Sequence, residues 1–191
     1  MKRTVTFGEI MLRLKTPEHM RILQTDAFEA SYGGAEANVA VSLAVLKDPV
    51  SFVTKLPENP VGTAALNEVR RYGADTSKVV IGGSRLGIYF FEKGTDIRPT
   101  NVVYDREGSA LALAKPEEFH WDEFLKDTDI FYFSGVTPAV SENIAKAVLE
   151  ALKYCKAHGI ETVCDLNYRS KMWDTKKAQS VMSELMNYVT L

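Results

Sequence analysis

Short apolar runs of strand length alternate with segments of helical spacing along most of this 191-residue chain. An apolar run bounded by turn residues is typical of a buried strand, and apolar residues three and four apart are typical of a covering helix. Alternation of the two predicts a parallel β-sheet with helices packed on it, the α/β class of fold. The expected strands cover residues 4–8, 50–56, 76–81, 130–133 and 160–164.

The segments between these strands carry helix start and stop signals. A helix is expected over residues 61–72, because Asn59 can cap its start, Pro60 suits its first turn and Gly73 can end it. Further helices are expected over residues 35–46, from residue 144 to a stop at Gly159, and over residues 178–189.

One stretch breaks the alternation. Residues 86–91 and 97–105 flank a turn at residues 93–96, which predicts an antiparallel hairpin. Residues 11–15 can add a third strand. We therefore expect a small antiparallel sheet that projects from the α/β core as a lid.

The charges are nearly balanced, since 23 Lys and Arg face 25 Asp and Glu and give a formal net charge of −2. Without a stripe of basic residues, the sequence predicts no nucleic-acid partner. The apolar runs fall well short of the roughly 20 residues that span a bilayer, so no membrane partner is expected. Met1 is followed by Lys2, Arg3 and a strand, without the apolar segment of a signal peptide, which favours a cytoplasmic protein.

No metal site is predicted. The histidines lack Asp, Glu or Cys partners at ligand spacing. They are His19, His120 and His158.

Gly33 and Gly34 stand directly before the first expected helix. Glycines let the backbone approach a ligand, and a helix start offers free N–H groups with a partial positive charge. A tight turn with close helix packing explains the two glycines equally well. Asn38 favours binding, because an amide in the first turn of an otherwise apolar helix has little reason to be there unless it caps or binds something.

The predicted hairpin carries Tyr89, Tyr104, Asp105 and Arg106. Tyrosine combines an apolar ring with a hydroxyl, which suits a sugar ring, and an arginine can bind a carboxylate with two parallel hydrogen bonds. The alternative is a half-exposed strand with an arginine at its end.

Asp165, Asn167 and Arg169 alternate at the carboxyl end of an expected parallel strand. Open α/β sheets bind ligands at that edge, so these polar groups are candidates for a binding site. In the alternative interpretation, Asp165 caps a turn and Arg169 pairs with it.

Together these motifs resemble the PfkB family of sugar kinases, which includes ribokinase and fructokinase. The segment Gly33-Gly34-Ala35-Glu36-Ala37-Asn38-Val39-Ala40 is similar to the N-terminal signature of that family. Four further motifs resemble its 2-keto-3-deoxygluconate kinase branch: Gly8-Glu9-Ile10-Met11, Gly87-Ile88-Tyr89-Phe90, Tyr104-Asp105-Arg106, and residues 165–169 with Trp173.

The resemblance implies a ribokinase-like three-layer αβα core with a β-sheet lid, and transfer of the γ-phosphoryl group of ATP, with Mg²⁺, to a sugar acid. It also implies a homo-oligomer formed through the lid. Arg106 would lie near the sugar carboxylate, and Arg169 would stabilise charge during transfer. The sugar-binding residues it implies are Gly33, Gly34, Ala35, Glu36, Ala37, Asn38, Tyr89, Tyr104, Asp105 and Arg106. Those facing the nucleotide are Asn167, Tyr168 and Arg169.

The sequence departs from the family pattern in one important respect. The second family signature, a Gly-Ala-Gly-Asp-type motif that supplies the catalytic base, is absent from these 191 residues. We therefore expect the chain to be the N-terminal part of a kinase domain, inactive alone, with an uncovered apolar sheet edge after its last strand and helix. Two alternatives stay open: a kinase for another sugar, such as fructose or 5-dehydro-2-deoxygluconate, and a non-catalytic sugar-binding module. The lid arginines favour an acid, because a neutral sugar leaves a guanidinium without a carboxylate partner.

Overall fold

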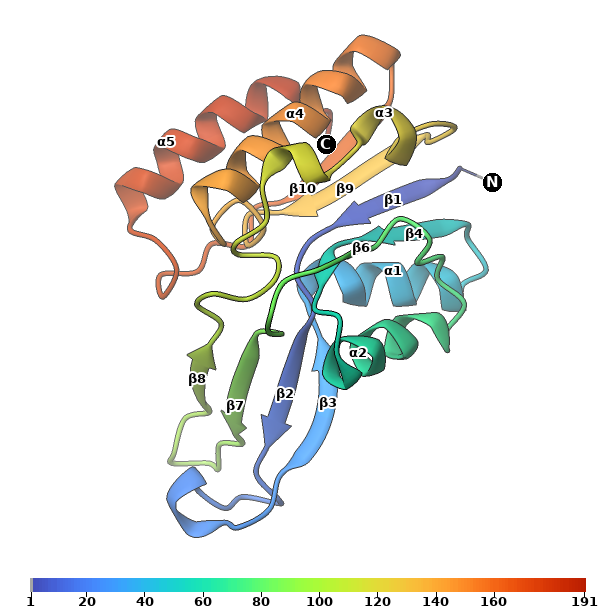
Figure 1. Ribbon diagram of the computed structural model, residues 1–191. Coiled ribbons are helices and arrows are strands. Elements are labelled where there is room, and N and C mark those ends of the chain that lie inside the picture. The colour runs from blue at the N-terminus through green and yellow to red at the C-terminus, as the bar shows by residue number, and fades with distance from the viewer. Residues whose placement is uncertain (1) are drawn as a thin grey trace.

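The computed structural model describes residues 2–191 and contains the two parts that the sequence predicts (Figure 1). The strands of the larger sheet are β1 (Thr4–Phe7), β4 (Val50–Val53), β9 (Ile130–Ser134) and β10 (Glu161–Asp165). Their order is β10-β9-β1-β4, and every neighbouring pair is parallel. The predicted α/β class is confirmed.

Helices cover both faces of this sheet (Figure 1). They are α1 (Ala35–Val45), α2 (Pro60–Arg70), the short α3 (Trp121–Phe124), α4 (Glu142–His158) and α5 (Thr175–Leu185). On β4, Phe52 packs into the apolar cluster with α1 and α2, and the next residue, Val53, packs into the cluster with α4. Because successive strand residues point to opposite faces, the sheet is the middle layer of three.

The helix ends follow the predicted signals. The side-chain oxygen of Asn59 accepts hydrogen bonds from the backbone N–H groups of Val61 (3.1 Å) and Gly62 (3.0 Å). Gly159 ends α4 in the left-handed conformation, with φ of 69°.

The last helix is shorter than predicted. It ends at Leu185, and a 3-10 turn over Met186–Tyr188 follows. The backbone N–H groups of Thr190 and Leu191 then donate to the Thr162 carbonyl oxygen at 3.0 and 3.1 Å. The expectation that the β10 edge is uncovered is therefore wrong in part, because the final two residues already pair with Thr162 and Cys164.

Two of the expected strands differ from the prediction. Residues 50–56 divide at Thr54 into β4 and the two-residue β5 (Lys55–Leu56). Of residues 76–81, only β6 (Val80–Ile81) is a strand, and it pairs in parallel with β5. The main sheet cannot continue past Val53 because its neighbour, β1, ends at the opposite residue, Phe7.

The smaller sheet, here called the lid, has four strands: β2 (Met11–Lys15), β3 (Glu29–Gly33), β7 (Ile88–Glu92) and β8 (Asn101–Asp105). Their order is β3-β2-β7-β8. The predicted hairpin of β7 and β8 is confirmed, but its loop spans residues 93–100 instead of 93–96. The lid is mixed rather than wholly antiparallel, because β2 and β7 run in parallel, and β3 was not predicted.

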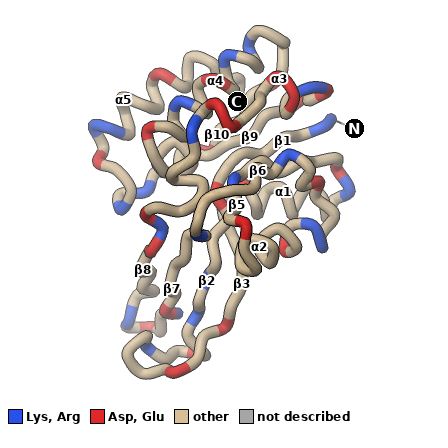
Figure 2. The backbone as a smooth tube through the Cα atoms, in the orientation of Figure 1, with Lys and Arg blue, Asp and Glu red and all other residues tan. Residues whose placement is uncertain are grey.

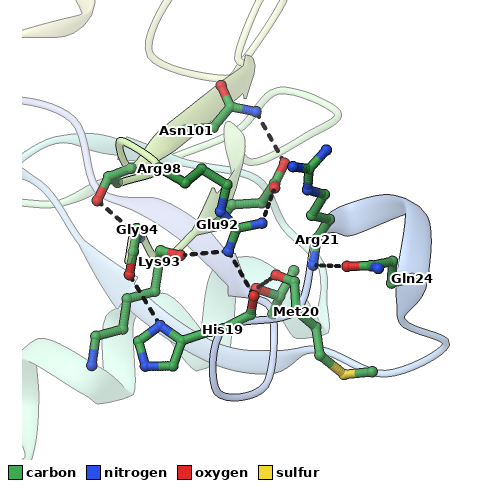
Figure 3. Close-up of polar contacts among 11 residues, drawn as sticks. His19, Met20, Arg21, Gln24, Glu92, Lys93, Gly94, Arg98 and Asn101 are labelled. Carbon is green, nitrogen blue, oxygen red and sulfur yellow. Dashed lines mark hydrogen bonds and ion pairs between the residues drawn. The ribbon is translucent and has the colours of Figure 1, made fainter. Parts of the chain in front are cut away.

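Hydrogen bonds join the two loops at the far end of the lid (Figure 3). Arg98 donates to the carbonyl oxygens of His19 at 2.6 Å and Lys93 at 3.1 Å, and it lies 3.8 Å from the Glu92 carboxylate. The Nδ1 atom of His19 lies 3.0 Å from the carbonyl oxygen of Gly94. The loop after β2 and the loop after β7 are thus fastened to each other.

Basic and acidic residues are interspersed along the backbone, as Figure 2 shows, in keeping with the small net charge. Among residues 2–191, no helix has the length and hydropathy needed to cross a membrane.

Candidate functional site

The site that the sequence predicts begins where β3 ends and α1 starts. Gly34 is the N-cap of α1. A β-carbon on Gly34 would lie 1.8 Å from the carbonyl oxygen of Glu9, so only glycine allows the loop after β1 to pass this close. The close-packing interpretation of the glycine pair is therefore confirmed. The binding interpretation stays a prediction for this helix start, which lies beside the lid.

Three predicted residues meet at this junction. A β-carbon built on Gly33 would lie 3.7 Å from the side-chain oxygen of Asn38 and 3.8 Å from the hydroxyl of Tyr89. The structure thus brings together a glycine, an exposed amide and a lid tyrosine that lie up to 56 positions apart in sequence. Amide and hydroxyl groups around an open backbone can hydrogen-bond several hydroxyls of one small ligand.

A row of polar and aromatic residues crosses one face of the lid. Strand register aligns Ser31 with Arg13, Arg13 with Tyr89, and Tyr89 with Tyr104. The rings of Tyr89 and Tyr104 have centroids 5.8 Å apart, and the Nε atom of Arg13 donates to the hydroxyl oxygen of Ser31 at 2.9 Å. Burial raises the pKa of Tyr89, so its hydroxyl remains a hydrogen-bond donor at neutral pH.

Arg13 and Ser31 were not among the site residues predicted from the sequence. Residues 11–15 were singled out only as a strand, although its alternation places Arg13 on the face opposite Leu12 and Leu14. A charged residue at the centre of the strand, between two leucines, was the available signal.

Arg106 lies at the end of the lid that adjoins the core. Its Nη2 atom forms an ion pair with Glu9, and its Nη1 atom lies 3.4 Å from the sulfur of Met172. The second oxygen of Glu9 accepts a 2.5 Å hydrogen bond from Ser109. Glu9 already pairs with Arg106, so this lid guanidinium has a carboxylate partner even without a bound acid, and the prediction that it would lack one is wrong in part.

Three predicted sugar-binding residues have side chains that are buried or already paired within the protein. Glu36 is 1% exposed, and its carboxylate accepts hydrogen bonds from Ser134 and Thr137, so direct contact with a sugar does not fit. Ala37 is buried in the apolar cluster beneath α1. Asp105 lies on the lid face opposite Tyr104 and forms an ion pair with Arg85 at 2.9 Å. Ala35, another predicted sugar-binding residue, is partly exposed at the start of α1.

The loop after β10 carries the residues expected to face a nucleotide. A side-chain oxygen of Asp165 accepts a hydrogen bond from the backbone N–H of Asn167 at 3.1 Å, and Asn167 has a positive φ of 33°. This is the turn of the alternative interpretation, but the ion pairs among residues 2–191 do not join Arg169 to Asp165. The Tyr168 hydroxyl donates within the loop, to the Trp173 carbonyl oxygen at 3.3 Å.

This loop also touches the lid. The Lys171 ammonium donates to the carbonyl oxygen of Val102 in β8 at 2.8 Å, and Met172 contacts Arg106. A cavity of about 600 Å³ lies between them, and its lining includes Tyr104, Asp105, Arg106, Lys171, Met172 and residues 139–141, which directly precede α4. The predicted lid residues thus border a cavity together with the C-terminal part of the loop after β10. Asn167, Tyr168 and Arg169 are not among its lining residues. A second cavity of about 670 Å³, lined by Arg3 and Pro49 among others, lies at the opposite ends of the strands.

Residues 2–191 contain no group of three or more His, Cys, Asp or Glu side chains placed to hold a metal ion. We assign no chemical step to that ion.

Residues 1–191 match the model of the pfkB family of carbohydrate kinases over their whole length. The chain belongs to the PfkB family. Its core and lid are similar to those of a crystal structure of 2-dehydro-3-deoxygluconokinase from Thermotoga maritima. That protein is 48% identical with a TM-score of 0.96, over 99% of this chain and 58% of that one. The ribokinase-like fold that the resemblance implies is therefore confirmed.

Two curated PfkB relatives are similar in sequence. A 2-dehydro-3-deoxygalactonokinase from Haloferax volcanii is 39% identical over 181 residues, which are 95% of this chain and 57% of that protein. A 5-dehydro-2-deoxygluconokinase from Shouchella clausii is 29% identical over 185 residues, which are 95% of this chain and 56% of that protein. The chain thus spans little more than half the length of the PfkB relatives it matches.

Proposed function

We propose that the protein containing these residues is an ATP-dependent kinase of a sugar acid of the 2-keto-3-deoxygluconate class, with Mg²⁺ as the ion of the nucleotide. In this proposal, residues 1–191 are the N-terminal part of one kinase domain. They bind the acceptor sugar and border the phosphate site. The observation that carries the proposal is the meeting of Gly33, Asn38 and Tyr89 at one end of a lid that also bears Arg106.

The lid face fits a small polyhydroxylated ligand. The paired rings of Tyr89 and Tyr104 offer apolar surface to a sugar, and their hydroxyls offer hydrogen bonds. Asn38 is exposed at the start of α1, where free backbone N–H groups also point outward. We propose that these groups hold sugar hydroxyls beneath the lid.

The Arg106 guanidinium supports an acid over a neutral sugar. Its terminal nitrogen Nη2 pairs with Glu9, but the other terminal nitrogen, Nη1, faces the thioether of Met172, which is only a weak hydrogen-bond acceptor. A carboxylate would give that nitrogen a charge-assisted hydrogen bond, whereas fructose would not. The names of the relatives agree with an acid, and they include both 2-dehydro-3-deoxy and 5-dehydro-2-deoxy sugars.

On the nucleotide side, we propose that Asn167 and Arg169 face the phosphates of ATP. Both belong to the loop at the carboxyl end of β10, and Arg169 is exposed there. A guanidinium at this point can stabilise charge that develops on the transferred phosphoryl group. The Tyr168 hydroxyl is occupied within the loop, so we assign it a role in holding the loop's shape.

We also propose that the lid joins two copies of the chain. The lid face opposite Tyr89 aligns Ala30, Leu14, Phe90 and Val103 across the four strands. Val103 is 47% exposed on this apolar row. Burial of such a row against a second lid would remove apolar surface from water.

The sugar assignment is tested by Arg106→Ala in the full-length protein, with a coupled assay of ADP release. Loss of a hydrogen bond to a charged group should weaken binding of 2-keto-3-deoxygluconate by about 1.5–3 kcal/mol, with little effect on fructose. Arg85→Ala is the matched control, because Arg85 pairs with Asp105 on the other lid face. Equal weakening for the acid and for fructose would show that Arg106 does not recognise a carboxylate.

A further inference from the structure

Glu9 carries a buried carboxylate that the proposed function does not use. Its side chain is 4% exposed, and both of its oxygens are occupied, one by Ser109 at 2.5 Å and the other by Arg106. A buried carboxylate is costly unless it is paired and hydrogen-bonded. Because a sugar cannot reach Glu9, any role in binding must act through its partners.

Two glycines of the predicted motifs make room for this ion pair. A β-carbon on Gly87 would lie 3.1 Å from a carboxylate oxygen of Glu9 and 3.3 Å from the β-carbon of Arg106. Gly34 packs on the backbone carbonyl of the same glutamate. Glu9 is thus held at the point where the lid, the start of α1 and Arg106 meet.

The pair also fixes which part of Arg106 is left for a ligand. Nη2 is committed to Glu9, whereas Nη1 faces the sulfur of Met172 at 3.4 Å. A thioether is a weak acceptor that a carboxylate can displace with a gain in hydrogen bonding. The flexible arginine side chain would otherwise lose rotamer entropy on binding, and a preformed ion pair removes much of that cost.

We propose that Glu9 is the positioning residue of the sugar-acid site, which orients the Arg106 guanidinium so that its Nη1 side faces the ligand. This inference rests on the proposed function, because it takes Arg106 as the group that binds the acid. Glu9 itself does not touch the sugar. It acts only through Arg106, and Ser109 and Gly87 keep it in place.

A double-mutant cycle on the full-length protein tests this dependence. The KM for 2-keto-3-deoxygluconate and kcat are measured for the parent, Glu9→Ala, Arg106→Ala and the double variant. We expect Glu9→Ala to raise KM by about tenfold or more when Arg106 is present, and by less than about twofold when it is absent. Glu9→Gln keeps an acceptor for Arg106 and should restore most of the affinity.

The controls separate positioning from general destabilisation. Urea unfolding of each variant shows whether it is folded. Glu29→Ala removes an exposed lid glutamate that pairs with Lys15, and it should leave KM unchanged. If Glu9→Ala does not fold, Glu9→Asp replaces it, since aspartate keeps the charge but is one methylene too short to reach both Arg106 and Ser109. We expect Glu9→Asp to raise KM by about threefold or more when Arg106 is present, and to have little effect in the Arg106→Ala background.

The outcomes distinguish this inference from the proposed function. If Arg106→Ala raises KM while the Glu9 variants do not, or if they raise it equally with and without Arg106, only the role of Glu9 is overturned. If Arg106→Ala leaves KM for the acid unchanged, the proposed function loses its carboxylate-binding group and this inference falls with it.

Discussion

At the carboxyl end of β10, the guanidinium of Arg169 extends from an exposed loop. A group that meets only the transferring phosphoryl contributes mainly in the transition state. In the full-length protein, Arg169→Ala should therefore lower kcat by about 10²–10³-fold, the usual range for one charge-stabilising donor, with sugar affinity nearly unchanged. Steady-state kinetics and isothermal titration with the sugar measure the two effects, with Lys176→Ala as an exposed control. Loss of sugar affinity with full turnover at saturation would contradict the assigned role.

Glu36 illustrates how a residue inside a binding motif can serve the fold. Its side chain turns away from the start of α1 and accepts hydrogen bonds from the backbone N–H of Ser134 and the hydroxyl of Thr137, both at 2.9 Å. It thereby joins α1 to the end of β9. The nearby ionisable side chains are Tyr132 and Cys164, and burial raises the pKa of each to about 12. Neither of them supplies a positive charge.

Burial raises the pKa of Glu36 above its usual 4.5, and hydrogen bonds from Ser134 and Thr137 offset only part of that effect. The folded protein therefore holds this proton more tightly than the unfolded chain. The contribution of protonated Glu36 to the free energy of unfolding is complete below pH 4.5. It is lost as the pH rises through the folded-state pKa, by about 1.4 kcal/mol per unit of difference between the folded and unfolded pKa.

Glu36→Gln should remove this loss. Urea unfolding at several pH values should show that the free energy of unfolding of the variant rises relative to that of the parent protein above pH 4.5. Below pH 4.5 the difference between the two free energies should be constant. Glu150→Gln, at an exposed position on α4, is the matched control and should show no such trend. A constant difference between Glu36→Gln and the parent across the whole range would mean that folding does not shift the pKa of Glu36.

At the scale of elements, the apolar lid face leads to a prediction about assembly. Val103→Lys places a charge on the exposed apolar row and should shift a lid-mediated dimer towards monomer by tenfold or more in dissociation constant, about 1.4 kcal/mol. Analytical ultracentrifugation measures the shift. Ile97→Lys makes the same change on a lid loop, at a position that is 97% exposed, and should leave assembly unaffected. An unchanged dimer in the Val103 variant would exclude this face as the interface.

The elements that the sequence predicts well are those with local causes. Capping by Asn59, the left-handed Gly159 and the buried run of β9 each act within a few residues, and the structure has all three. The misses have non-local causes. Strand β3 reads EASYG, with little apolar content, and becomes a strand because β2 lies beside it. The division at Thr54 likewise depends on where β1 ends.

At the scale of the whole molecule, the sequence predicted which residues belong to the candidate site better than it predicted which of them contact one another. Tyr89, Tyr104 and Arg106 stood out in the sequence, but the Glu9 partner of Arg106 lies 97 positions away. No local pattern links the two residues, and only the return of the chain from the lid into the core brings them together. The hydrogen bond from Lys171, in the loop after β10, to Val102 of β8 depends on the same return of the chain.

A polypeptide limited to residues 1–191 should show no kinase activity. Phosphoryl transfer depends on positioning and charge stabilisation, and it needs a group to accept the proton of the sugar hydroxyl. Three carboxylates near the predicted motifs could be considered for that role, and each is committed elsewhere. Glu36 is 1% exposed, Asp105 pairs with Arg85 on the far lid face, and Asp165 closes a turn at Asn167.

The measurement is a coupled ADP-release assay on the purified 191-residue polypeptide, with millimolar ATP, Mg²⁺ and 2-keto-3-deoxygluconate. We expect no sugar-dependent rate above a no-enzyme control, while thermal unfolding with and without the sugar reports whether the polypeptide is folded and binds it. A sugar-dependent rate would require a base among these residues. Because Asp165 is exposed at the carboxyl end of β10, where ligands of open α/β sheets bind, Asp165→Asn would then be the first variant to test.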